Sequence, residues 1–379
     1  MLIGIPKEIK NHEYRVGLTP AGVKELVASG HKVLVETAAG AEIGLSDEDY
    51  LRAGAAITDS AEQVFKQADM IIKVKEPQAK ECKMLRSNQT LFTFLHLAAD
   101  PEQTQLLIDS GATCIAYETI TDDQGGLPLL APMSEVAGRM AIQQAAHFME
   151  KSHGGNGLLM GGVPGVAPAK VLVIGGGVVG LNAARMAMGL GADVTILDKS
   201  LTRLNEIDAN YGVGIKNIYS TIDSIEQYIT DADVVIGAVL IPGAAAPKLV
   251  TREMLKLMKC GALLVDVAID QGGCFETSKG TTHENPTYIV DGITHYCVAN
   301  MPGGVARTST FALTNATIPY VMSLANKGIH EALAEDQHLN NGLNIFSGKV
   351  THEAVAIALG HTYSNKSFDQ SPTILAAEQ

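Results

Sequence analysis

The stretch VLVIGGGVVG at residues 171–180 decides the fold of the central part of this chain. It has the pattern of an apolar strand, a G-x-G-x-x-G turn and the beginning of a helix. Gly175 permits the tight turn, Gly177 lets the backbone approach a pyrophosphate, and Gly180 lets the helix pack close to the strand. The N-terminus of such a helix also offers unpaired N–H groups to phosphates. The pattern therefore predicts a dinucleotide-binding unit.

A second apolar strand, VTILD at residues 194–198, ends in an acid. Asp198 lies about 20 residues beyond the glycines, where a ribose-binding carboxylate is expected. A carboxylate accepts hydrogen bonds from a ribose 2′-hydroxyl and repels a 2′-phosphate, so NAD is favoured over NADP. Lys199 and Arg203 are nearby cations that weaken this preference without reversing it. Arg203 either flanks the adenine ribose or is a solvated helix residue.

Composition limits the class of protein. The chain has 379 residues, 46% hydrophobic and 18% charged, which suits a compact protein with two domains. The net charge of −13 argues against a nucleic-acid partner. No apolar run reaches the roughly 18 residues of a membrane span, and no signal-peptide pattern is present, so we expect a cytoplasmic protein. The five cysteines form no C-x-x-C pair, so we expect reduced, buried thiols and no zinc site.

Strands and helices alternate through the central part. Near-continuous apolar strands separated by helices predict a parallel sheet covered on both faces. We expect strands at 170–174, 193–197, 233–240, 263–268 and 294–298, and helices at 132–151, 179–190 and 308–326. Pro319 lies inside the last of these helices and predicts a kink or break.

The first part of the chain repeats this pattern. Residues 29–36 resemble 190–198, and residues 67–74 resemble 231–238. We therefore expect an α/β protein with two Rossmann-like domains, their parallel sheets flanked by helices and an active-site cleft between them. The expected catalytic or substrate domain comprises 1–131 and 305–379, and the expected NAD-binding domain comprises 132–304. The C-terminal tail is expected to add amphipathic helices to the first domain and no nucleotide-domain strand.

Two segments resemble one known family. GIPKEIKNHEYRVGLTPAGV at residues 4–23 and the segment 163–180 are similar to the signatures of alanine dehydrogenases and of the NAD-binding subunit of proton-translocating transhydrogenase. Gly17 departs from the alanine common at that position. The similarity runs nearly end to end and is closest to the bacterial alanine dehydrogenases. It implies NAD-dependent, reversible conversion of L-alanine to pyruvate and ammonia by a homohexamer.

The resemblance implies a substrate-binding role for two cations. Arg15 lies in a polar segment, and its planar guanidinium suits a carboxylate, although an isolated arginine is usually a surface residue. Lys75 follows the apolar segment 70–74, at the edge of a parallel sheet where α/β proteins bind ligands. Lys73 is an alternative, because strand side chains alternate and it points to the same face. The family match selects Lys75.

Two further residues are candidates for proton transfer. His96 ends the apolar segment 90–96, and its ordinary pKa near 6.5 suits general acid–base catalysis, although such a histidine is often structural. Asp270 follows the strand at 263–268 and could orient water, or it could simply cap the turn that follows. Asp266, inside that strand, is expected to be structural.

The remaining family matches are expected around the cofactor and substrate. Glu118, Met133 and Asn300 are candidates to support or line the substrate pocket. The expected cofactor-binding set is Ser134, Gly175, Gly177, Val178, Val179, Gly180, Asp198, Arg203, Ser220, Val239, Leu240, Val267, Ala268, Ile269, Asp270, Val298, Ala299, Asn300 and Met301.

Other functions remain open from the sequence. The alternatives are the transhydrogenase subunit, a related amino-acid dehydrogenase, and a non-catalytic NAD sensor. The presence of all four of Arg15, Lys75, His96 and Asp270 argues against a sensor. No metal-binding spacing is recognised, and His352 with Glu353 is too small a set to indicate one.

Overall fold

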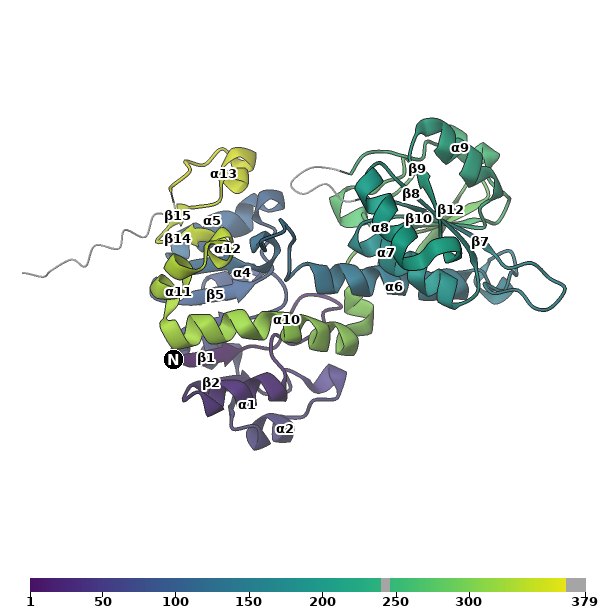
Figure 1. The fold of residues 1–379 in the computed structure, drawn as a ribbon. Helices are drawn as coiled ribbons and strands as arrows, with labels where there is room; N and C mark the ends of the chain where they lie inside the picture. Colours follow the sequence, from purple (N-terminus) through teal and green to yellow (C-terminus); the bar gives the residue numbers. More distant parts are fainter. Residues whose placement is uncertain (240–245, 366–379) are drawn as a thin grey trace, which may run out of the picture. The chain divides into compact units, whose positions relative to one another are not determined.

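The computed structural model describes residues 1–239 and 246–365. These residues form two compact units, residues 1–130 with 306–365, and Ala131–Val305. Each unit is built on its own sheet of mostly parallel strands (Figure 1). We call them unit 1 and unit 2. Within the described residues, no helix combines the length and the apolar character needed to cross a membrane.

Unit 1 contains an eight-stranded sheet with the order β15-β14-β6-β5-β4-β1-β2-β3. Its strands are β1 (Leu2–Ile5), β2 (Lys32–Glu36), β3 (Ala56–Thr58), β4 (Met70–Ile72), β5 (Thr90–Thr93), β6 (Thr113–Ala116), β14 (Leu343–Phe346) and β15 (Lys349–Val350). Its helices are α1 (Pro20–Ala28), α2 (Asp47–Arg52), α3 (Ala61–Gln67), α4 (Ala79–Cys82), α5 (Pro101–Ser110), α10 (Ala306–Lys327), α11 (Ile329–Glu335), α12 (Gln337–Asn341) and α13 (Glu353–Leu359).

Unit 2 contains a seven-stranded sheet with the order β12-β13-β11-β10-β7-β8-β9. Its strands are β7 (Lys170–Ile174), β8 (Asp193–Asp198), β9 (Lys216–Tyr219), β10 (Val234–Gly237), β11 (Leu263–Asp266), β12 (Thr287–Val290) and β13 (Ile293–Tyr296). Its helices are α6 (Ala131–Phe148), α7 (Val178–Gly189), α8 (Leu201–Tyr211) and α9 (Ile222–Asp231). The strand order reverses at β7, which is the doubly wound arrangement that places ligands at the carboxyl edge of the switch point.

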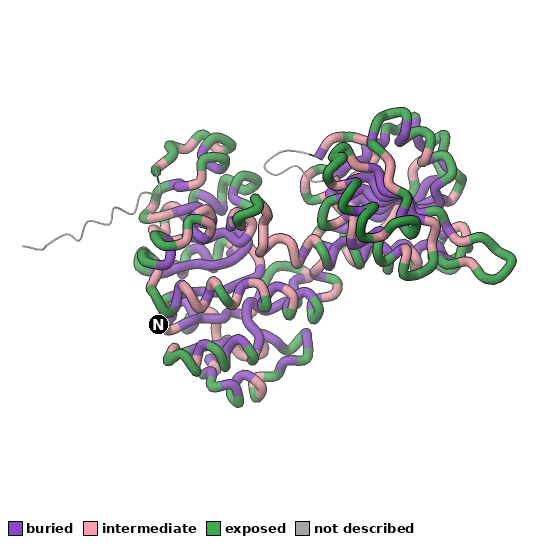
Figure 2. Tube along the Cα trace, in the orientation of Figure 1, coloured by how far each residue is buried: buried purple, intermediate pink, exposed green. Residues whose placement is uncertain are grey.

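The expected α/β class with two sheets flanked by helices is confirmed. The sheets are not wholly parallel, however, because β12 pairs antiparallel with β13, and β14 pairs antiparallel with β6 and β15. The tail therefore extends the sheet of unit 1, in addition to supplying helices. The central strands of both sheets are buried, whereas the edge strands β9 and β12 contain no buried residue, and many loops and outer helix faces are exposed (Figure 2).

Helix α10 contradicts the break predicted at Pro319 as one of two outcomes, the other being a kink. The helix runs without interruption from Ala306 to Lys327, so proline does not end it. Proline removes one intrahelical hydrogen bond, but tertiary packing can override that loss. The buried residues Leu313, Thr317 and Val321 anchor the helix on both sides of the proline.

Candidate active site

In unit 1, the residues singled out from the sequence follow four neighbouring strands. Arg15 lies beyond β1, Lys75 beyond β4, His96 beyond β5 and Glu118 beyond β6. These strands are parallel and adjacent in the order β6-β5-β4-β1. Their carboxyl ends therefore share one edge of the sheet, where ligands of α/β proteins bind.

Arg15 is buried rather than exposed. Its residue surface is 3% exposed, and Nε and Nη2 of its guanidinium donate to the Glu13 carboxylate at 2.6 and 2.5 Å. Glu13 therefore holds the Nε–Nη2 edge of the guanidinium in a fixed orientation. The sequence reading did not include Glu13, whose role depends on this local pairing.

Lys73, the alternative to Lys75, is fully buried between two carboxylates. Its Nζ lies 2.9 Å from Glu8 Oε2 and 2.8 Å from Glu81 Oε1. Burial alone lowers the pKa of Lys73, but Glu8 and Glu81 outweigh it and raise that pKa above its ordinary value. Burial also raises the pKa of Glu8, an effect that Lys73 opposes. Lys73 is thus a charged structural residue of the interior.

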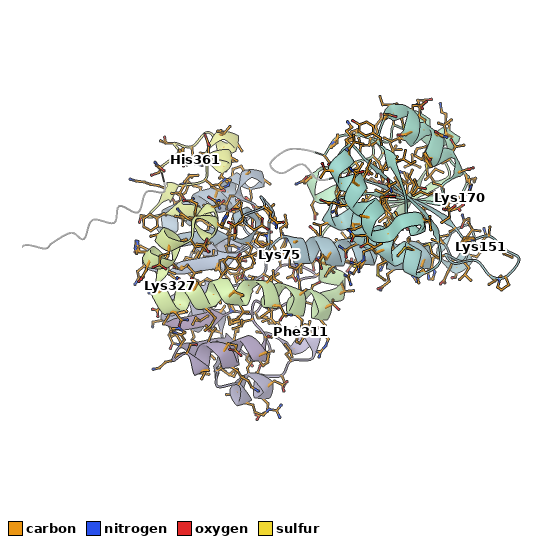
Figure 3. All side chains as sticks on the ribbon, viewed as in Figure 1. Lys75, Lys151, Lys170, Phe311, Lys327 and His361 are labelled. Atoms are coloured by element: carbon orange, nitrogen blue, oxygen red, sulfur yellow. The ribbon has the colours of Figure 1, made fainter. Side chains whose placement is uncertain are left out.

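Lys75 differs in its exposure. Lys75 is labelled in Figure 3, and its side chain is only partly buried. Its Nζ lies 3.6 Å from Oε2 of Glu76. The Val74 and Lys75 amides donate to Glu8 Oε1 at 2.6 and 3.3 Å, which fixes the backbone under the lysine. Burial tends to raise the pKa of Glu76, but Lys75 and then Lys10 outweigh it and lower that pKa. Glu8 thus links buried Lys73 to the loop that carries Lys75.

His96 occupies a strained backbone position. Its φ of +51° is left-handed, a conformation that non-glycine residues seldom adopt and that clusters at functional sites. The His96 amide donates to Glu118 Oε1 at 2.6 Å, and the Leu95 amide donates to the same carboxylate at 3.2 Å. The imidazole stacks on Phe94 at 5.8 Å and is 48% exposed. Glu118 therefore fixes the backbone while the ring stays accessible to a ligand.

The glycine turn of unit 2 connects β7 to α7. Gly175 has φ of +101°, and a Cβ at Gly180 would lie 1.8 Å from the carbonyl oxygen of Gly175. Both positions thus require glycine for the turn itself. A Cβ at Gly177 would meet no atom within 4 Å, so there is open space beside this residue. No side chain caps the N-terminus of α7, whose N–H groups suit a pyrophosphate.

Asp198 ends β8 and contacts this turn. Its two carboxylate oxygens accept from the Gly176 amide at 2.6 Å and the Ser200 amide at 2.7 Å. Arg203 Nε donates to the Gly176 carbonyl at 2.6 Å, and Nη1 pairs with Glu206. Asp198 and Arg203 therefore hold the turn from two sides. Each carboxylate oxygen retains a second lone pair that could accept from a ribose hydroxyl.

The other expected cofactor residues mostly follow strand ends of the same sheet. Ser220 follows β9 and Val239 follows β10, whereas Ser134, Val178 and Val179 lie on helices. Val267, Ala268, Ile269 and Asp270 follow β11, and Val298, Ala299, Asn300 and Met301 come after β13. Leu240 lies outside the described residues. Met301 and Ala268 are buried and pack in the hydrophobic core of unit 2.

Asp270 and Asp266 have opposite environments. Asp270 is exposed on the short 3-10 segment Ile269–Gln271. Asp266 is fully buried and accepts from the Ser278 hydroxyl at 2.5 Å and from the Ala268 and Phe275 amides. Burial raises the pKa of Asp266, and these hydrogen bonds lower it in part. Asp266 therefore stabilises the loop that presents Asp270.

The cysteines correct one detail. Cys82, Cys114, Cys274 and Cys297 are buried free thiols, whereas Cys260 is exposed. Burial raises the pKa of Cys82 and of Cys274 to about 12, so these thiols stay protonated at neutral pH.

Comparisons with known proteins cover both units. Residues 4–137 match the N-terminal domain of the alanine dehydrogenase/PNT family, and residues 141–353 match its C-terminal domain. An alanine dehydrogenase of Halomonas elongata is 62% identical over 96% of this chain and 98% of its own length. A solved L-alanine dehydrogenase superposes with a TM-score of 0.92 at 49% identity, covering 95% of this chain and 99% of its own.

A transhydrogenase structure from Sinorhizobium meliloti is more distant. Its TM-score is 0.80 at 27% identity, with coverage of 93% of this chain and all of the other. This chain thus shares its fold with both relatives, while its sequence identity is higher to the alanine dehydrogenases. This chain belongs to the alanine dehydrogenase/PNT family.

Proposed function

We propose that this protein is an NAD-dependent L-alanine dehydrogenase that reversibly converts L-alanine to pyruvate and ammonia. The observation that carries the proposal is 62% identity to an alanine dehydrogenase over nearly the whole of both chains. The glycine turn and the uncapped start of α7 fit a nicotinamide dinucleotide. The Asp198 carboxylate favours NAD over NADP, because it would repel a 2′-phosphate.

The cofactor, when bound, supplies the hydride acceptor. Arg15 and Lys75 bind the substrate carboxylate and carbonyl, and Glu13 and Glu8 position them through the contacts described above. Glu13 fixes the orientation of the Arg15 guanidinium, and a cation in a fixed orientation favours a single substrate pose.

His96 and Asp270 serve as proton-transfer groups in this mechanism. His96 exchanges a proton with the substrate through its accessible imidazole. Glu118 accepts a hydrogen bond from the His96 amide and so holds the backbone that carries this ring. Asp270 orients the water that is added on the way to pyruvate, and its exposure keeps the carboxylate accessible to that water. Both groups are displayed at strand ends rather than buried in a core.

The test is an assay of NADH oxidation by the purified chain with pyruvate and ammonia. Glyoxylate in place of pyruvate tests a related amino-acid dehydrogenase, and NADPH in place of NADH tests cofactor choice. We expect activity from the chain alone, whereas a transhydrogenase subunit requires a second nucleotide-binding component. Near-normal amination by both His96→Ala and Asp270→Asn would contradict the assigned roles.

We also propose a cytoplasmic homohexamer, as the family resemblance implies. Light scattering coupled to size-exclusion chromatography gives the mass of the assembly directly. A mass of one or two chains at working concentration would contradict the hexamer. Cell fractionation followed by immunoblotting tests the location.

A further inference from the structure

The C-terminal end of α6 carries a side-chain cluster that the dehydrogenase reaction does not use. His147 lies in the last turn of the helix, Glu150 follows the helix, and His153 ends the 3-10 segment Lys151–His153. One ligand atom from each of the three side chains lies within 4.8 Å of the other two. All three residues are exposed, so the cluster is open to ions from solvent.

The three side chains are close enough to share one ion. The ring centroids of His147 and His153 are 3.7 Å apart, with an interplanar angle of 37°. Glu150 Oε2 lies 3.4 Å from Nδ1 of His153. Imidazole nitrogens and a carboxylate oxygen are ligand types that divalent transition-metal ions bind, and here all three side chains lie within reach of one ion.

The backbone holds this arrangement in place. The Glu150 amide donates to the His147 carbonyl at 3.2 Å, and the His153 amide donates to the Glu150 carbonyl at 3.1 Å. The chain then turns back at Gly155, where a Cβ would lie 2.3 Å from the Phe148 carbonyl oxygen. The turn therefore fixes the backbone positions from which the three side chains project, which reduces the ordering cost of binding.

Phe148 supports both histidines from the protein interior. Its ring meets His147 edge-on at 4.9 Å and His153 edge-on at 6.1 Å. Phe148 also packs at 5.6 Å from Tyr296, which belongs to the buried core of unit 2. The two imidazoles thus rest on an apolar wall that restricts their rotation.

The charges around the cluster are of both signs, and the helix C-terminus and Glu150 supply the negative ones that attract a cation. The C-terminus of an 18-residue helix carries a partial negative charge, and His147 lies in its last turn. Lys151 is the opposing cation on the same turn, and the methylene groups of its side chain lie beside Gly157. Ser152 Oγ lies 3.2 Å from Nδ1 of His153 and provides a further oxygen beside the cluster.

We propose that His147, Glu150 and His153 form a binding site for a divalent transition-metal ion, with zinc as the ion to test first. Two imidazoles and one carboxylate suit zinc, copper or nickel, whereas magnesium and calcium prefer oxygen ligands. Three protein ligands leave at least one coordination position for water. The bound ion joins the end of α6 to the segment that leads toward β7.

The spacing explains why the sequence did not reveal the cluster. The residues follow the pattern H-x-x-E-x-x-H, and six helical residues would not return His153 to the face of His147. The chain leaves the helix after Phe148, and the turn brings His153 back over His147. The site therefore depends on the end of the helix, not on its periodicity.

The experiment is calorimetric titration of the full, untagged protein with zinc chloride after removal of metals by a chelator. We expect one zinc ion per chain. His147→Ala and His153→Ala should each weaken binding by at least about tenfold, because even changes to residues behind metal ligands cost about 10–100-fold. Glu150→Gln should weaken binding, since it removes the negative charge. Zinc should raise the unfolding temperature of the wild type more than that of these variants.

Matched controls separate the site from other metal-binding groups. His330→Ala and Glu226→Gln change exposed residues outside the cluster and should bind zinc as the wild type does. Cys260→Ser removes the exposed thiol and should also leave zinc binding unchanged. Circular dichroism checks that each variant is folded. Absence of stoichiometric zinc binding by the wild type, or unchanged binding by His147→Ala and His153→Ala, would overturn the proposal.

Discussion

Three glycines of the β7–α7 region allow stability to be separated from cofactor binding. In Gly180→Ala the new Cβ would lie 1.8 Å from the Gly175 carbonyl oxygen, whereas real Cβ contacts are not shorter than 3.0 Å. Helix α7 must therefore move by more than 1 Å against a backbone atom that cannot rotate away. Overpacking costs about 1–3 kcal/mol, and the helix propensity of alanine returns at most about 1 kcal/mol.

The control for Gly180→Ala is Gly189→Ala in the same helix. A Cβ at Gly189 meets no atom within 4 Å, so this substitution should stabilise the protein by up to about 1 kcal/mol. Gly177→Ala also meets no protein atom, so stability should change little. Its methyl group would instead occupy space that the pyrophosphate needs, and the KM for NAD should rise about tenfold or more.

Two measurements on each variant separate an effect on stability from an effect on cofactor binding. Urea unfolding followed by circular dichroism gives the change in stability, and NADH formation at varied NAD gives kcat and KM. We expect Gly180→Ala to lose stability and Gly177→Ala to lose cofactor affinity at nearly normal stability. Equal stability of Gly180→Ala and Gly189→Ala, or normal NAD binding by Gly177→Ala, would refute the roles given to these glycines.

Three further predictions concern charged groups. Lys73→Met should destabilise the protein by about 3–5 kcal/mol, because it leaves Glu8 and Glu81 buried without their cation. Lys75→Met should change stability by less than about 1 kcal/mol and yet abolish most of the activity. Urea unfolding and activity assays of both variants test this contrast. Asp198→Asn should raise kcat/KM for NADP relative to NAD by about tenfold or more, because it removes the charge that repels a 2′-phosphate; an unchanged ratio in the steady-state assay would argue against the assignment. Burial raises the pKa of Asp266 above its ordinary 3.8, so the folded state binds this proton more tightly than the unfolded state does. Protonation of Asp266 therefore stabilises the fold at low pH, and this stability is lost as the pH rises from about 3.8 through the folded pKa. The stability of wild type relative to Asp266→Asn, measured by urea unfolding at several pH values, should therefore fall over that range.

The sequence predicted much of the fold because the relevant signals are local. Strand–turn–helix units are encoded by apolar runs and glycines a few residues apart, and the edge positions of Lys75 and His96 follow from where each strand ends. The antiparallel strands β12, β14 and β15 were not predicted, because they depend on pairing partners rather than on a local pattern. The break predicted as one outcome at Pro319 is absent for the same reason, since packing of α10 outweighs a local helix-breaking signal.

What the sequence alone determined is therefore the class of fold and the residue types at the strand ends. Only the tertiary structure decided that Lys73 is buried and Lys75 is not. The partners of Lys73 are Glu8, which lies 65 residues before it, and Glu81, which lies several residues after it. Likewise, the pairing of Arg15 with Glu13 and the meeting of His147 with His153 depend on how the backbone turns. Charge, burial and distance are properties of packed neighbours, and a linear pattern does not specify them.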